Sequence, residues 1–171
     1  MSEKKFKAVE QAARDLFDFA VDREDVKWLL KRLPAEAQVR RATVEYELQI
    51  LKIVSVGWSI AYYLENSPLK NPIAERYWKA VNAFAGSLSE ATGLMIGRDI
   101  DYFQTLKDRL DMYVAALAEH PHAAEPARIV GPAFARQCGN EADLFAFMAG
   151  SKMFFSTVNR VKEYLEATKA L

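Results

Sequence analysis

Residues 43–65 read TVEYELQILKIVSVGWSIAYYLE, and this stretch decides the fold. At helical spacing, the first half of this stretch is amphipathic, with polar residues on one face and apolar residues on the others. The second half is apolar nearly all round. A helix that is apolar on every side is buried, either in a protein core or in a membrane. The uncharged run from Ile53 to Leu64 is too short for a bilayer, which needs about 20 apolar residues. We therefore expect a central core helix.

Prolines indicate where this helix begins and ends. Pro34 suits a first helical position, and Asn66-Ser67-Pro68 blocks continuation at the other end. A helix between those points would be roughly 48 Å long. That length is large for one domain, so we expect part of the helix to protrude or to pack against a second subunit.

Composition indicates a single helical domain over residues 1–171. Hydrophobic residues make up 51% and aromatic residues 12%, which is ample for a core. Basic and acidic residues balance at 23 each, which argues against nucleic-acid binding and gives little repulsion against self-association. One cysteine, Cys138, and an N-terminus without an apolar leader predict a cytoplasmic protein.

Helical spacing extends over the rest of the chain, and no strand signal is convincing. We predict an all-α fold, an irregular bundle of about six helices around two long, largely buried ones, residues 43–65 and 141–169. Whether residues 3–33 form one bent helix or two stays open. The last helix is expected to bury a set of large apolar side chains: Leu144, Phe147, Met148, Phe154, Phe155, Val158, Val161 and Leu165.

Small residues recur every fourth position on three of the predicted helices, which allows another backbone to approach closely. The sets are Ala85, Ser89, Gly93 and Gly97; Gly57 and Ala61; and Ala142, Ala146 and Gly150. Tight packing inside the bundle is the favoured interpretation, and a dimer seam is the alternative.

Aromatic side chains gather on two consecutive helices and give the best indication of a ligand pocket. Trp58 and Tyr62 lie near the end of the central helix, and Tyr77 and Trp78 lie near the start of the next. A short loop makes these helices antiparallel neighbours, so the rings can meet. The candidate ligand-binding residues, polar groups included, are Trp58, Tyr62, Arg76, Tyr77, Trp78 and Asn82. Core packing and a partner-binding hot spot are the alternatives.

The two histidines, His120 and His122, lie in one loop. They are weak candidates for a metal site, with Cys138 or Glu125 as further ligands, because a structural zinc site needs about four ligands. Cys138 reads better as a small buried apolar residue, since the end of a helix disfavours a thiolate. The chain contains no phosphate-binding loop and no nucleophile elbow, so no cofactor is predicted.

Two functions follow from these observations. The first is a non-enzymatic helical interaction or regulatory protein, expected to form a homodimer or to bind a protein partner. The second is a small-molecule-binding protein or enzyme with an aromatic pocket around Trp58 and Trp78. Neither hypothesis involves nucleic acid or a membrane.

Overall fold

The computed structural model describes residues 2–96, 101–168 and 170, with side chains for all of these except 91–96. This part of the chain contains helices and no strand, which confirms the all-α prediction. The helices are α1 (Glu3–Val21), α2 (Glu24–Leu30), α3 (Arg41–Tyr63), α4 (Lys70–Ile96), α5 (Tyr102–Ala118), α6 (Ala127–Gln137) and α7 (Leu144–Ala167).

Helices α1 and α2 are separate, which answers the question about residues 3–33. The hydroxyl of Ser2 accepts a hydrogen bond from the backbone N–H of Lys5 and caps α1. The chain then turns at Asp22, whose carboxylate accepts the backbone N–H of Glu24 at 2.9 Å. A polar turn with its own hydrogen bonds therefore divides the two helices.

Helix α3 is shorter than predicted, because it begins at Arg41 and not near Pro34. The preceding segment is held against the connection between α6 and α7. The backbone N–H of Gln38 donates to Asp143 Oδ2 at 3.1 Å, and its side-chain oxygen accepts from Asn140 at 2.8 Å. The 23 residues of α3 span roughly 35 Å, so helix length no longer argues for a second subunit.

The last helix also starts later than predicted, at Leu144. Asp143 caps α7 by accepting the N–H of Ala146 at 2.8 Å, whereas Asn140 closes a turn three residues before. Pro132 lies inside α6, and the helix continues through it to Gln137. A proline inside a helix often breaks or kinks it, but α6 is one helix here.

Small residues mark points of tight packing between helices. A side chain on Gly57 would overlap the ring of Trp78, and one on Gly150 would overlap the ring of Phe134. These two glycines let α4 approach α3 and let α6 approach α7. Gly93 and Gly97 lie outside the residues whose packing the structure describes.

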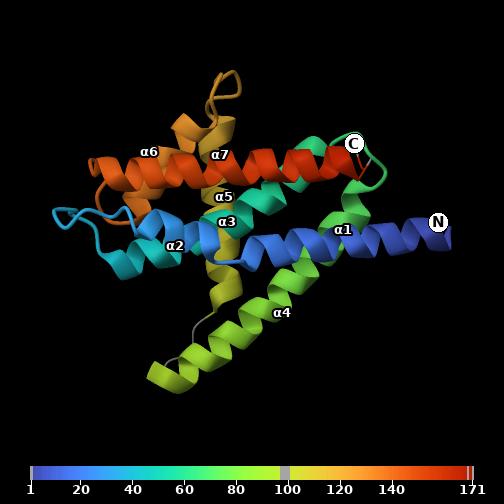
Figure 1. Cartoon of the computed structure of the whole chain (residues 1–171), viewed down its shortest axis with the longest axis horizontal. Coiled ribbons are helices and arrows are strands. Elements are labelled where there is room, and N and C mark those ends of the chain that lie inside the picture. Colours follow the sequence, from blue (N-terminus) through green and yellow to red (C-terminus); the bar gives the residue numbers. More distant parts are fainter. Residues whose placement is uncertain (1, 97–100, 169, 171) are drawn as a thin grey trace.

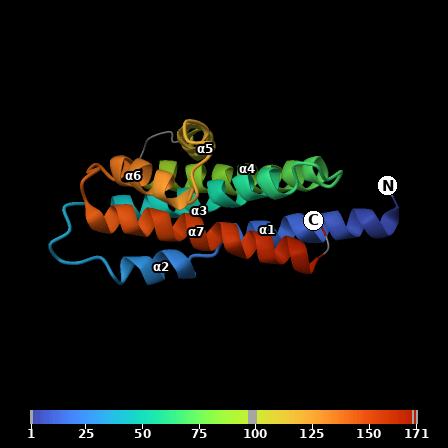
Figure 2. The ribbon, with the colours of Figure 1, turned by 90° about the horizontal axis from the view of Figure 1, so that it is seen from above.

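The arrangement places α3 at the centre, in contact with α1, α2, α4, α5, α6 and α7. Helix α7 runs alongside the line formed by α2 and α1, and α5 crosses the bundle steeply (Figures 1 and 2). The far end of α4 projects beyond the other helices (Figure 1). Within the described residues, no helix combines the length and the apolar character that crossing a membrane demands.

Buried charges on α3 fix two of its neighbours. Lys52 is fully buried, and its ammonium group donates to the backbone oxygen of Asp22 at 2.9 Å and pairs with Asp25 Oδ2 at 3.1 Å. Glu47 is buried and receives two hydrogen bonds from Arg109 of α5, at 2.7 and 2.9 Å. These contacts attach the α1–α2 junction and α5 to the central helix.

Candidate functional site

The aromatic residues that were predicted to line one pocket lie in two separate places in the structure. Tyr77 is fully buried and donates its hydroxyl hydrogen to the backbone oxygen of Ile53 at 2.7 Å. Trp78 packs edge to face on Tyr77 and covers Gly57. Both rings therefore serve the contact between α3 and α4, where a side chain at position 57 would have no free space.

Trp58 and Tyr62 face the other side of α3, toward α7. Their rings stack at 4.7 Å between centroids, and Trp58 also packs against Phe154 at 5.4 Å. They line a groove of about 480 Å³ together with Phe155 and the loop at Pro126. This groove is the part of the predicted pocket that has space for a ligand.

The remaining predicted ligand residues lie elsewhere. Arg76 donates to the backbone oxygen of Pro72 at 3.0 Å and lies over the ring of Phe6, against α1. Asn82 is exposed on α4. Neither lines the groove of Trp58 and Tyr62, and whether any of these residues binds a ligand stays a prediction.

His120 and His122 are exposed in the connection between α5 and α6. Cys138 is buried at the far end of α6, where it caps the helix. Burial, with the nearby charges of Glu47 and Asp143, raises the pKa of the Cys138 thiol to about 12. Among the described residues, no three His, Cys, Asp or Glu side chains come together to hold a metal ion.

Helix α7 carries the main surface that sequence reasoning missed. Leu144, Met148 and Phe155 were expected in the core, but they are 69%, 59% and 62% exposed. At 3.6 residues per turn these positions fall within about 40° of one another around the helix. The segment from Leu144 to Val158 has one charge, Lys152, so its pattern does not indicate which side faces out. We call these three residues the α7 face.

Further exposed aromatic side chains continue the α7 face on both sides. Tyr62, 58% exposed, shares a groove with Phe155. On the other side, a groove of about 750 Å³ runs between α7, the start of α6 and the end of α2, and it contains Met148 and Phe155. Lys152 and Leu29 connect it to a smaller groove of about 480 Å³ at Trp28. We call these two connected hollows the α2–α7 groove.

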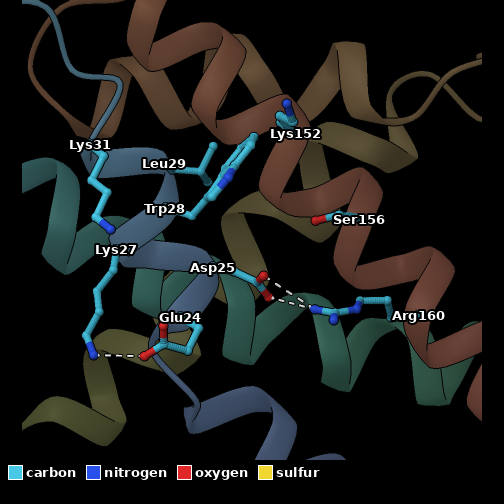
Figure 3. A pocket seen from close by; sticks show the side chains of 9 residues that line it. All are labelled: Glu24, Asp25, Lys27, Trp28, Leu29, Lys31, Lys152, Ser156 and Arg160. Atoms are coloured by element: carbon cyan, nitrogen blue, oxygen red, sulfur yellow. Dashed lines mark hydrogen bonds and ion pairs between the residues drawn. The ribbon is translucent and has the colours of Figure 1, made fainter.

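The electrostatics of the α2–α7 groove are dominated by cations around Trp28 (Figure 3). The Arg32 guanidinium lies 3.3 Å from the centroid of the Trp28 ring, and the Lys152 ammonium lies 4.3 Å from it. Deeper in the groove, Asp25 pairs with Arg160 at 3.1 Å while also holding the buried Lys52. The arrangement offers positive charge beside an exposed apolar strip.

Comparisons with protein-family models, curated proteins and solved structures find no match to this chain.

Proposed function

We propose that this chain is a non-enzymatic helical interaction protein whose protein partner docks on the α7 face. The observation that supports it is the gathering of exposed apolar side chains. Five of the eight large apolar side chains that are exposed in the described residues lie on or beside this face: Leu144, Met148, Phe155, Tyr62 and Trp28.

The size of the surface favours a protein over a small ligand. Large apolar side chains exposed to this extent contribute roughly 100 Å² each, which gives on the order of 500 Å² in total. A stable protein interface buries about 800 Å² on each partner. The apolar strip therefore has the dimensions of the centre of such an interface, and it exceeds what a compact ligand covers.

The buried polar groups support a role without catalysis, because they serve the fold. Lys52 and Glu47 are each engaged by groups of a neighbouring helix or turn. The raised pKa of Cys138 keeps its thiol protonated at neutral pH, which disfavours nucleophilic chemistry. None of these groups lines the grooves beside α7.

The α7 face supports self-association less well than it supports binding of a different protein. Lys152 lies between Met148 and Phe155 on this side of the helix. A two-fold axis through the middle of the face would bring the two copies of Lys152 together, and like charges in an interface are unfavourable. The zero net charge remains the argument for a homodimer.

Site-specific photo-cross-linking in the cells that make the protein tests the proposal. A photoreactive phenylalanine analogue replaces Met148 or Phe155, and in a control chain it replaces Val114, which is 42% exposed on α5. We expect discrete adducts from positions 148 and 155 and none from 114. An adduct mass of twice 19.4 kDa indicates a homodimer, whereas another mass indicates a different partner.

The control position makes the result decisive. Equal adducts from all three positions, or none from 148 and 155, contradict an interface at the α7 face.

The groove of Trp58 and Tyr62 supports a second function, binding of a small molecule. Its volume of about 480 Å³ lies in the range of ligand pockets, roughly 300–1,000 Å³. Tryptophan fluorescence during titration with a panel of metabolites tests it, with Trp58→Phe as the control. A spectral shift that persists in Trp58→Phe, or no shift with any compound, contradicts binding at this groove.

A further inference from the structure

The α2–α7 groove carries an excess of positive charge, although the whole chain is neutral. Its lining contains twice as many basic as acidic side chains. The basic ones are Lys27, Lys31, Arg32, Arg128, Lys152 and Arg160, and the acidic ones are Glu24, Asp25 and Glu125. Positive charge is therefore concentrated at this surface.

Each acid of the groove already has a basic partner. Glu24 pairs with Lys27 at 2.9 Å, Asp25 pairs with Arg160 at 3.1 Å, and Glu125 pairs with Arg128. Within the described part of the chain, the other three cations have no carboxylate within ion-pair distance: Lys31, Arg32 and Lys152. These three are available to an acidic partner.

Two of the available cations are held in place by Trp28. Arg32 stacks on its ring and donates to its backbone oxygen at 3.0 Å, and Lys152 reaches the same ring from α7. Figure 3 shows Lys152 approaching Trp28 from the opposite helix. A cation held over an aromatic face loses less side-chain freedom when it binds a carboxylate. The position of these two cations therefore favours binding of a partner that carries carboxylates.

The apolar part of the groove fits a helix. From Phe145 to Phe155, which both line it, α7 advances about 15 Å, or about three turns. An amphipathic helix of that length places apolar residues at i, i+3 or i+4, and i+7 into such a hollow. The flexible side chain of Met148 can adapt to different anchors.

We infer that the partner on the α7 face is an acidic amphipathic helix, with apolar side chains between α7 and α2 and carboxylates at Lys31, Arg32 and Lys152. This inference rests on the proposed function and adds the chemistry of the partner. A single-stranded nucleic acid needs basic residues along its whole path, whereas this lining is apolar over most of the larger hollow. A membrane surface fits a protruding face better than a groove.

Two designed helical peptides test the inference with the full chain. They share the same apolar positions over about four turns, and the flanking positions are Glu in one and Lys in the other. Fluorescence anisotropy of the labelled peptides measures binding. We expect the Glu peptide to bind about tenfold more tightly, with affinity falling as salt rises.

A charge reversal provides the matched control. The double variant Arg32→Glu/Lys152→Glu changes two exposed residues and is expected to reverse the preference toward the Lys peptide. The variant Lys79→Glu/Lys107→Glu changes the net charge equally at exposed positions of α4 and α5, and it is expected to keep the preference for Glu.

Several results would overturn the inference. Equal binding of the two peptides, absence of binding, or an unchanged preference after the reversal removes the acidic helix as partner. So does tighter binding of an oligothymidine or of phosphatidylserine-containing vesicles than of the Glu peptide. If adducts still form at positions 148 and 155, only the chemistry of the partner is wrong; if adducts are absent there, the proposed function fails as well.

Discussion

The central helix α3 and the long helix α7 that packs against it depart in opposite ways from the rule that apolar residues lie inside and charged residues outside. Helix α3 buries charge, with Glu47 and Lys52 removed from solvent. Helix α7 exposes apolar surface at Met148 and Phe155. Each exception costs free energy, but only the buried charges recover that cost within this chain, through ion pairs and hydrogen bonds.

The difference separates structural from functional features. The buried charges of α3 find their partners on α5 and at the α1–α2 junction, so they orient those elements. The exposed side chains of α7 have no such partner in the described residues, and large exposed apolar patches mark interaction sites. We therefore assign fold specificity to α3 and propose recognition as the role of the exposed side chains of α7.

Two adjacent phenylalanines of α7 give the sharpest test of this assignment. Phe154 is 4% exposed and Phe155 is 62% exposed. We expect Phe154→Ala to lower the free energy of unfolding by about 4 kcal/mol because it leaves a cavity, and Phe155→Ala to change it by less than about 0.5 kcal/mol. Urea unfolding measures both. Similar losses for the two variants would mean that Phe155 is also part of the core.

The buried ion pair of α3 and α5 gives the next largest effect. Arg109→Met removes the two hydrogen bonds to Glu47 and leaves a buried carboxylate unpaired, which costs about 3 kcal/mol. The double variant Glu47→Leu/Arg109→Met removes both charges and is expected to regain most of that stability. Urea unfolding of the single and double variants measures both free energies of unfolding. A double variant as unstable as the single one would show that the loss does not come from the unpaired carboxylate of Glu47.

Two helical glycines with different surroundings test the close approach of α4 to α3. A methyl group on Gly57 would overlap Trp78, whereas Gly86 has open space around it. Gly57→Ala is expected to lower the free energy of unfolding by about 2 kcal/mol through overpacking. Gly86→Ala is expected to raise it by about 0.5–1 kcal/mol, since alanine favours the helix. Thermal unfolding that moves in the same direction for both would contradict this account.

The fold class could be predicted from sequence because apolar spacing is repeated over the whole chain. Helix boundaries were less predictable where a distant residue decides them. The start of α3 depends on Gln38 reaching Asp143 and Asn140, more than 100 positions away. Local signals at Pro34 cannot report that contact, and they placed the start too early.

The α7 face could not be predicted from the sequence for a different reason. Around Met148 the sequence is apolar on every side of the helix, so periodicity does not distinguish core from surface. The aromatic residues predicted to line one pocket do lie on α3 and α4, but at two separate places. Trp78 packs over Gly57 between these helices, whereas Trp58 faces α7. The sequence alone does not show which ring fills the space beside Gly57. The small-residue spacing did identify Gly57 and Gly150 as packing points.

The thiol of Cys138 gives the mildest test, because it changes no residue. Burial and nearby acidic charge raise its pKa from 9.0 to about 12, so the thiol stays protonated in the folded protein at pH 8.5. Only the thiolate reacts with iodoacetamide. We expect modification at pH 8.5 to be slow in buffer and fast in urea, as followed by mass spectrometry.

The same pKa shift makes stability depend on pH. Between pH 9 and 12 the unfolded thiol releases its proton while the folded thiol keeps it. The contribution of Cys138 to stability is therefore present below pH 9 and is lost as the pH rises toward 12. Rapid modification in buffer at pH 8.5 would show instead that α6 opens at its end and exposes the thiol. That outcome would weaken the contrast between a packed interior around α3 and the proposed recognition surface on α7, because the first residues of α6 line the α2–α7 groove.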